Sequence, residues 1–337
     1  MCGIAGRILT EPDLVGADLV KLMHAQRHRG ADSTGFALYG KPLESGYIVR
    51  AMTAKRQNLS ADLEFFLDLL REHGSDFLSD PTHDEADSDH VSVRMEIREP
   101  TSLTDWVQQI DEYSDRIEVQ SVGRALEIVK DLGGAAEVAE KHNVRDFIGT
   151  HGLGHARMAT ESDVSPTASH PFWARPFPDV AIVHNGQITD YFTWRARLER
   201  KGYRFMTEND SELLAVWISD RMSQGETQAD ALKRSLTEID GCFTFLYSNH
   251  DRLGFAKDRW AIKPLVAVDS NNDQLGFAKD RWAIKPLVAV DNNSALSIAP
   301  EEQAVRTIHL DEVEVVNFDG PSLIKTWQTQ SSLDRAA

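Results

Sequence analysis

Apolar and polar positions divide the first forty residues into three short elements. The apolar segments CGIAGRIL (2–9) and TGFALYG (34–40) predict strands. Between them, the spacing of apolar residues from Ala17 to Gln26 predicts a helix, and the polar, glycine-containing sequence RHRGADS (27–33) predicts a turn into the second strand. The chain is therefore expected to begin its fold with two strands joined by a helix.

The pattern changes between Lys41 and Thr150, which suggests an insertion of about 41–150 into a larger domain. This segment contains an acidic run at 79–90 (SDPTHDEADSDH) and an alternating sequence at 91–97 (VSVRMEI) that predicts a strand. Helices are predicted around Leu63–Arg71, at 104–113 and over Val122–His142. The apolar spacing of Val122–Lys130 is interpreted as core packing.

Strand and turn patterns become denser after Thr150. Strands are predicted at 148–160 (IGTHGLGHARMAT), at 178–188 (PDVAIVHNGQI) and from Cys242 onward, and helices at 189–202, 207–223 and 227–239. Grouped helices and strands separated by antiparallel-type turns favour an α+β protein, with helices layered on sheets, over a regular parallel βαβ sheet.

A sequence of 22 residues occurs twice in tandem, at 248–269 and 270–291. The two units differ only at His250/Asn272 and Arg252/Gln274. Each unit is expected to form a hairpin from LGFAKD and LVAVD. Two units are too few for a solenoid, so one of them is expected to occupy a normal position in a sheet. The sequence does not distinguish which.

Charge and composition exclude several classes of partner. Asp and Glu number 53 against 36 Lys and Arg, giving a net charge of -17, which opposes binding to nucleic acid and to anionic lipid. Hydrophobic residues make up 41% of the chain, enough for a sizeable core, but no segment has the roughly 18 consecutive apolar residues of a membrane span. A cytoplasmic protein without membrane association is expected.

The two cysteines, Cys2 and Cys242, suggest neither a disulfide framework nor a zinc site. Cys242 lies in an apolar segment and is expected to be a small core residue. Cys2 directly follows Met1, and cleavage of Met1 would leave a thiol and a free α-amine on one residue. An α-amine has a pKa near ~8, against ~10 for lysine, so an N-terminal cysteine carries its own base.

Five segments in order give Cys2 more weight: MCGIAG, RHRGADSTG, GHARMAT, VHNGQI and TENDSE, followed by AKDRWAIKPL. Together they resemble the class II glutamine amidotransferases, N-terminal-nucleophile enzymes that hydrolyse glutamine to supply ammonia. The resemblance covers about 1–40 and 148–310. It implies a four-layer α/β/β/α sandwich over 1–320 with the insertion described above, a C-terminal tail at 321–337, and a first strand that delivers Cys2 to one end of the sheets.

The resemblance also assigns residues to the substrate. Arg157 matches the arginine that binds the glutamine carboxylate, for which a planar guanidinium is well suited. Asp210 matches the residue that binds the ammonium group, and Thr160 matches a threonine that contacts substrate. Taken alone, Arg157 could be a surface ion-pair residue and Asp210 a helix cap.

Cys2, Asn185, Gly186 and Arg29 match the residues of the reaction itself. Asn185, through its side-chain amide, and Gly186, through its backbone N–H, correspond to the oxyanion hole, where each donor contributes ~3 kcal/mol. Arg29 matches an arginine near the catalytic cysteine that holds the N-terminal segment. Asn-Gly alone could be a hairpin turn, and Arg29 alone a surface ion-pair residue.

No metal or cofactor is implied by these motifs. His83 and His90 in the acidic run, and His24 and His28 four residues apart, could form metal pairs, but a solvated loop and a polar helix face are the simpler interpretations. Three further histidines lie in or near the motifs and are expected to shape the site rather than act as base: His155, His170 and His184.

The expected function is a glutaminase subunit whose ammonia is used by a synthase on another chain. The sequence TESDVSPTASHPF (160–172) and the long insertion are most similar to separate amidotransferase subunits that accompany FMN-containing, glutamate-synthase-like chains of the N-methylglutamate synthase type. Two alternatives remain. The chain could use its N-terminal thiol to hydrolyse another amide, or it could be a non-catalytic subunit that retains Met1.

Overall fold

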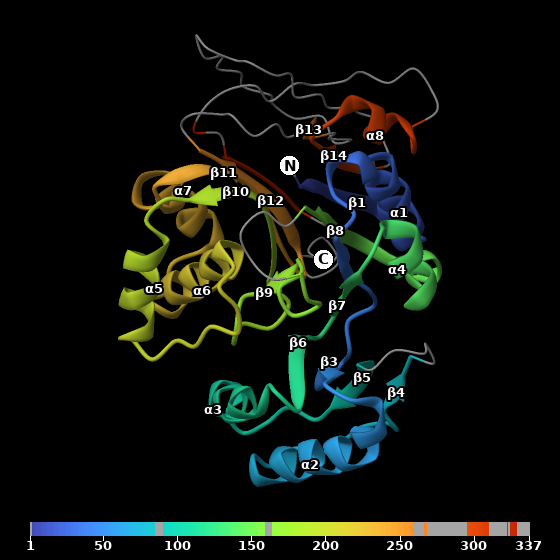
Figure 1. Cartoon of the computed structure of the whole chain (residues 1–337), viewed down its shortest axis with the longest axis vertical. Helices are drawn as coiled ribbons and strands as arrows, with labels where there is room; N and C mark the ends of the chain where they lie inside the picture. Colours follow the sequence, from blue (N-terminus) through green and yellow to red (C-terminus); the bar gives the residue numbers. More distant parts are fainter. Residues whose placement is uncertain are drawn as a thin grey trace.

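The fold is built on two antiparallel sheets that face each other, as the computed structural model shows (Figure 1). The structure describes residues 2–84, 90–158, 164–258, 266–267, 295–309, 322 and 324–328. The larger sheet has the order β13 (Val266–Ala267), β14 (Ala295–Ala299), β1 (Gly3–Asp13), β8 (Gly149–Arg157), β2 (Ser33–Tyr39), β7 (Leu126–Leu132). The smaller has the order β15 (Ile324–Gln328), β12 (Arg252–Lys257), β11 (Gly241–Asn249), β10 (Ala181–Ile188), β9 (Phe172–Trp173).

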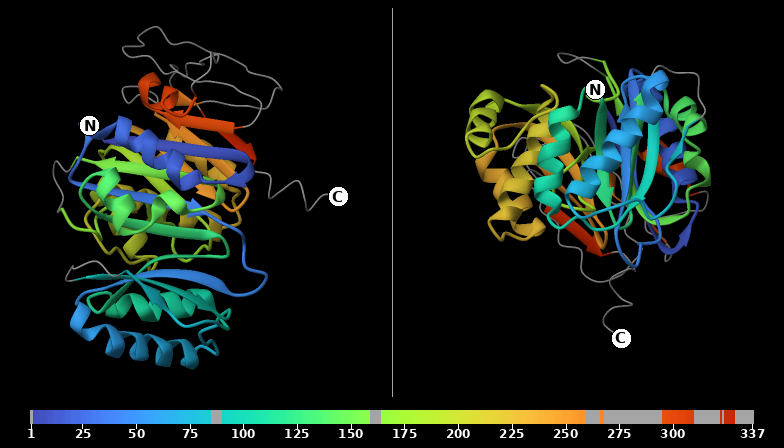
Figure 2. Two further views of the ribbon diagram at one scale, coloured as in Figure 1. Left: turned by 90° about the vertical axis from the view of Figure 1, so that its right-hand side faces the viewer. Right: turned by 90° about the horizontal axis from the view of Figure 1, so that it is seen from below.

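Helices cover the outer faces of both sheets and complete four layers (Figures 1 and 2). The six-stranded sheet is covered by α1 (Val15–Ala25), α4 (Ala135–Lys141) and α8 (Glu302–Arg306). The five-stranded sheet is covered by α6 (Asp210–Ser223) and α7 (Gln228–Glu238), and α5 (Tyr191–Glu199) packs against α6. The expected α+β, four-layer α/β/β/α sandwich is confirmed. Among the helices that the structure describes, none combines the length and the apolar character that crossing a membrane requires.

The inner faces of the two sheets pack closely. A Cβ atom added at Gly6 on β1 would lie 3.1 Å from Leu253 Cδ1 on β12, so a side chain there would push the sheets apart. Hydrogen bonds also join the sheets: Tyr39 Oη donates to the Ser248 carbonyl over 2.9 Å. Strand β2 is buried on both faces, because a sheet lies on one side and helices on the other. This explains why its sequence is a continuous apolar run.

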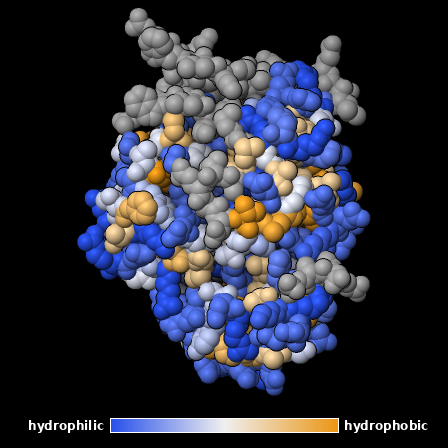
Figure 3. All heavy atoms as spheres, in the orientation of Figure 1, coloured by the Kyte–Doolittle hydropathy of each residue, from blue (hydrophilic) through white to orange (hydrophobic). Residues whose placement is uncertain are grey.

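Most of the inserted segment forms a third unit at one end of the sandwich (Figure 2). Its four-stranded sheet has the order β4 (Thr82–His83), β5 (Val91–Ile97), β3 (Tyr47–Thr53), β6 (Ile117–Gly123), and its helices are α2 (Leu59–Glu72) and α3 (Leu103–Ile110). Phe66 of α2 and Trp106 of α3 pack edge to face with ring centres 5.6 Å apart. Figure 3 shows a largely hydrophilic surface over this unit, and apolar side chains gathered nearer the middle of the molecule.

The predicted helix over Val122–His142 is wrong in its first half. The chain forms β6 up to Gly123 and then β7, and only Ala135–Lys141 is helical. Strand β7 pairs with β2 in the main sheet, so the chain leaves the inserted unit before residue 150. Six of its seven residues are buried, which removes the polar alternation that marks a strand in sequence.

The first tandem unit does not form the expected hairpin. Its segment 252–257 is β12, which pairs with β11 in the five-stranded sheet, whereas Val266–Ala267 pair with β14 in the six-stranded sheet. The unit therefore crosses from one sheet to the other. The second unit, 270–291, lies outside the described residues. Cys242, expected in the core, is half-buried because it stands near the start of β11.

Candidate functional site

Cys2 lies where β1 begins, beside the end of β8. Gly3 pairs with Ala156, and the antiparallel register extended by one residue sets Cys2 opposite Arg157. Cys2 Sγ lies 3.8 Å from the carbonyl oxygen of Met158, and the cysteine is half-buried. The Arg157 side chain is buried at this end of the sheet. The six-stranded sheet thus places the thiol and a guanidinium residue on neighbouring strands.

The main-chain carbonyl of Cys2 receives hydrogen bonds from two side chains. Asn185 Nδ2 donates from β10 of the facing sheet over 3.0 Å, and Arg29 Nη1 donates from the turn after α1 over 3.4 Å. Asn185 is itself buried. These contacts fix the N-terminal segment between the two sheets.

Arg29 is held in turn by Glu301, the residue that precedes α8. Arg29 Nε lies 2.6 Å from Glu301 Oε1, and His28 Nε2 lies 3.1 Å from the same carboxylate. Burial alone raises the pKa of Glu301, but Arg29 and His28 outweigh that effect and hold the pKa below its usual value. Glu301 is therefore an ionised partner of Arg29. No local motif in the sequence indicated this residue.

Two glycines allow the backbone to approach at this site. A Cβ atom at Gly30 would lie 2.5 Å from the Arg157 carbonyl carbon, so only glycine fits where the turn after α1 passes β8. Gly186 has a φ of +157°, and a Cβ there would lie 2.1 Å from the Cys242 carbonyl oxygen. The close packing of β10 on β11 therefore depends on Gly186.

Asp210 is the first residue of α6 and is anchored at the end of β10. Its Oδ2 accepts a hydrogen bond from the Ile188 backbone N–H over 3.0 Å, and its Oδ1 lies 3.6 Å from His184 Nδ1. Burial by itself raises the pKa of Asp210; His184 and the hydrogen bonds from Ile188 and Ser211 outweigh it, so the pKa lies below the usual carboxyl value. Asp210 is thus an anion at the start of α6, hydrogen-bonded to β10, the strand that carries Asn185.

Three buried histidines lie behind these residues. His155 Nε2 is 3.0 Å from the His184 carbonyl oxygen and 2.5 Å from His170 Nδ1. Burial lowers the pKa of His155 to about 3, and burial together with the neighbouring His155 lowers that of His170 well below its usual value. Both rings are therefore neutral near pH 7, in agreement with a role in shaping the site.

The structure thus brings Cys2, Arg29 and Asn185 into direct contact and sets Arg157 on the strand beside Cys2. Asp210 lies at the same end of the sandwich, where it contacts residues of β10. Thr160, the predicted substrate threonine, lies outside the described residues. Over the ranges that the structure describes, no group of three or more His, Cys, Asp or Glu side chains could hold a metal ion.

Comparisons with known proteins bear on the family of the chain. Residues 155–278 match a family described as "Glutamine amidotransferase domain". The chain is 34% identical over 276 residues to a "Putative glutamine amidotransferase" of Methanothermobacter thermautotrophicus. The aligned region covers 80% of this chain and 88% of that protein. It is 32% identical over 273 residues to the "Glutamine amidotransferase-like protein GlxB" of Rhizobium meliloti, over 80% of this chain and 86% of that one.

A solved structure with the same fold is the glutamine phosphoribosylpyrophosphate amidotransferase of B. subtilis. The two superpose with a TM-score of 0.53 at 18% identity, over 97% of this chain and 49% of the other. At that identity the likeness concerns the fold, and it reproduces the N-terminal-nucleophile architecture. The extent and identity of the matches to whole relatives decide the family: the chain is a class II glutamine amidotransferase.

Proposed function

We propose that the chain hydrolyses L-glutamine to glutamate and ammonia through a thioester on Cys2, and that a synthase on a partner chain uses the ammonia. The observation that carries this proposal is the position of Cys2. Its carbonyl is 3.0 Å from the Asn185 amide, and its neighbour across the sheet is Arg157. A thiol, an amide donor and a buried cation then converge on one end of the sandwich.

The nucleophile forms when Met1 is removed and the α-amine of Cys2 is free. The amine takes the thiol proton, and the thiolate attacks the δ-amide carbon of glutamine. When the carbon–nitrogen bond breaks, ammonia leaves with the proton from the ammonium group and a γ-glutamyl thioester remains. Water then attacks the thioester, which releases glutamate and restores the thiol. Burial lowers the pKa values of His155 and His170 and makes them weak bases, which leaves the amine in that role.

The developing negative charge on the amide oxygen is stabilised by Asn185 and Gly186. An amide nitrogen carries two hydrogens, and the Cys2 carbonyl uses one of those on Asn185. The second, together with the backbone N–H of Gly186, is assigned to the oxyanion. Donors that are already in place before the reaction are the most effective, because they need no reorganisation.

The two charges of the amino acid are assigned to Arg157 and Asp210. A buried guanidinium suits a carboxylate, and the lowered pKa of Asp210 keeps it ionised for an ammonium group. This pair favours a free amino acid over the side chain of a protein, whose α-groups are in peptide bonds. It therefore argues against an N-terminal-thiol hydrolase of other amides.

The proposed ammonia acceptor is a separate chain of the FMN-dependent, glutamate-synthase-like type. The support comes from the relatives: this chain covers 88% of a protein named only for its amidotransferase. By contrast, it covers 31% of the amidophosphoribosyltransferase of Methanocaldococcus jannaschii, to which it is 28% identical over 146 residues. Purification of the native protein from cells should yield a larger flavin-containing partner.

The test of the chemistry compares the two cysteines. Release of glutamate from glutamine is measured for the wild-type chain and for Cys2→Ala and Cys242→Ala. The proposal predicts that Cys2→Ala abolishes hydrolysis and that Cys242→Ala, which removes the half-buried thiol of β11, retains it. Hydrolysis by Cys2→Ala at the wild-type rate would contradict the thioester mechanism.

A further inference from the structure

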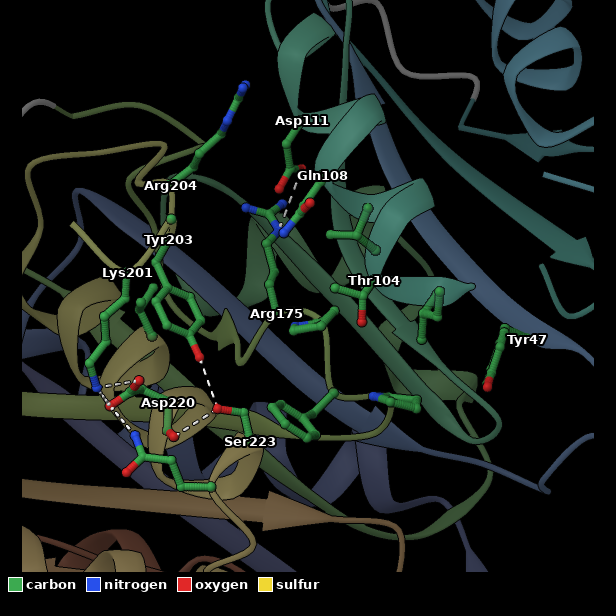
Figure 4. A pocket seen from close by; sticks show the side chains of 18 residues that line it. Tyr47, Thr104, Gln108, Asp111, Arg175, Lys201, Tyr203, Arg204, Asp220 and Ser223 are labelled. Carbon is green, nitrogen blue, oxygen red and sulfur yellow. Dashed lines mark hydrogen bonds and ion pairs between the residues drawn. The ribbon is translucent and has the colours of Figure 1, made fainter. Parts of the chain in front are cut away.

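A second cavity lies between the inserted unit and the helices of the five-stranded sheet (Figure 4). Its volume is about 660 Å³, within the range of sites that bind small molecules. Its walls come from α3, the loop 175–178, residues 201–204 after α5, and the last turns of α6. None of the residues assigned above to glutamine or to the reaction lines it.

The cavity is well separated from the glutamine site along α6. This helix begins at Asp210 and ends at Ser223, and its 14 residues span about 21 Å at 1.5 Å per residue. Ser223 and Asp220 line the cavity, so it lies at the opposite end of the helix from Asp210. A ligand here would contact the helix that carries the proposed ammonium-binding residue without reaching the substrate.

The walls of the cavity are mainly apolar. They contain Leu103, Val107, Pro176, Phe177, Pro178 and Val216. The phenol ring of Tyr203 adds a flat aromatic surface, and its hydroxyl is held 3.2 Å from Ser223 Oγ. Such walls favour a ligand with an apolar or aromatic body.

Arg175 provides the cationic group of the cavity and lacks a full set of partners. In Figure 4 its guanidinium points toward Asp111 and Gln108. Arg175 Nε lies 3.8 Å from Asp111 Oδ1, which is too long for a hydrogen bond, and this buried nitrogen makes no hydrogen bond among the described residues. Arg175 Nη2 donates to the Val119 carbonyl, which holds the side chain in place, whereas its charge has only the long contact with Asp111. An acidic group of a ligand would pair with this charge.

A second arginine, Arg204, also lines the cavity. Arg204 is half-exposed and pairs with the equally exposed Glu112 over 2.7 Å, a kind of surface pair that contributes little and can rearrange. The third cation, Lys201, is already held by Asp220, with Nζ 2.7 Å from both carboxylate oxygens. Arg175, whose contact with Asp111 is long, and Arg204, whose surface pair can rearrange, are therefore the cations assigned to an anion.

We propose that this cavity binds a small molecule with a flat apolar body and one acidic group, such as a carboxylate, sulfonate or phosphate. The body packs between Val107, Phe177 and Val216. The acidic group pairs with Arg175, and Arg204 closes on it from the rim. The site is independent of glutamine hydrolysis.

The test uses 8-anilinonaphthalene-1-sulfonate, a fluorescent aromatic sulfonate of this class, titrated against the full chain. We expect saturable binding of about one probe per chain. Arg175→Gln should weaken it by about tenfold or more, because a charge-assisted hydrogen bond is lost. Thr104→Trp, at an exposed position of α3 that lines the cavity, should prevent binding by filling the space.

Two matched variants control for other surfaces. Arg234→Gln removes an exposed arginine of α7, and Phe192→Ala removes an apolar side chain that is 82% exposed; both should bind the probe as the wild type does. Circular dichroism verifies that each variant is folded. If Arg175→Gln does not fold, Thr104→Trp alone tests the site. Absence of saturable binding, or equal affinity in Thr104→Trp, would overturn the site. Unchanged binding by a folded Arg175→Gln would overturn the assignment of an acidic ligand.

Discussion

Arg29 Nε donates a 2.6 Å hydrogen bond to the carboxylate of Glu301, 272 positions away in the sequence. The same guanidinium reaches the carbonyl of Cys2 over 3.4 Å. The segment that precedes α8 therefore positions the N-terminal cysteine through a single intermediate side chain.

Glu301→Gln should lower glutamine hydrolysis while leaving the fold intact. The substitution keeps the size of the side chain but removes its charge, and charge-assisted hydrogen bonds are about twice as strong as neutral ones. Because Glu301 is partly exposed, we expect a moderate loss, about threefold to tenfold in kcat/KM. Glu302→Gln, which only breaks a surface pair with Arg306, is the control. Equal kinetics for the two variants would show that Glu301 has no positioning role.

Asp210→Asn separates substrate binding from a structural role, since the cap of α6 is Asn209 and Asp210 joins the helix to β10. Asparagine still offers an oxygen to the Ile188 N–H, so a purely structural role predicts little change. Loss of the negative charge should raise KM for glutamine by about tenfold or more, since a charged partner contributes roughly 1.5–3 kcal/mol. The measurement is steady-state kinetics over a range of glutamine concentrations. An unaltered KM would leave Asp210 with only a structural role, the hydrogen bond from Ile188 that joins α6 to β10.

Asn185→Ala should reduce kcat by about 10²–10³, the usual effect of removing one oxyanion donor. It also removes the 3.0 Å hydrogen bond to the Cys2 carbonyl. Gln187→Ala changes an exposed amide on the same strand and should leave kcat near the wild-type value. If the two alanine variants are equally active, Asn185 does not serve the oxyanion.

Buried histidines should make the protein less stable in acid. Burial lowers the pKa of His151 to about 3, whereas an unfolded histidine has a pKa near 6.5. Below pH ~6.5 the unfolded chain therefore binds a proton that the folded chain does not, and stability falls as pH falls until about pH 3. The slope is about 1.4 kcal/mol per pH unit for each such histidine.

His151→Gln tests this origin of the acid sensitivity. Glutamine retains a donor for the Asn249 carbonyl, which His151 Nε2 contacts over 2.7 Å, but it does not titrate. The free energy of unfolding, measured with denaturant at several values between pH 7 and pH 4, should fall less steeply for this variant than for the wild type. Parallel curves would mean that His151 contributes nothing to the pH dependence.

The sequence predicted the sandwich and much of its site because these features are local or motif-based. The runs at 2–9 and 34–40 are buried strands, and the short motifs carry Cys2, Asn185 and Arg157. Where a segment is buried on both faces, as in β7, alternation is lost and a strand resembles a helix. The first tandem unit was wrongly predicted to be a hairpin, because two strands adjacent in sequence can join different sheets. The pairing of Arg29 with Glu301 was not predicted, because it leaves no local signal in the sequence.

The central claim is that Cys2 acts as the N-terminal residue. Its most direct test is mass spectrometry of the N-terminal peptide after reaction with 6-diazo-5-oxonorleucine, a reactive glutamine analogue. The account predicts a peptide that begins at Cys2, lacks Met1 and carries one adduct on the thiol. A peptide that retains Met1 and carries no adduct, from protein that still hydrolyses glutamine, would contradict it.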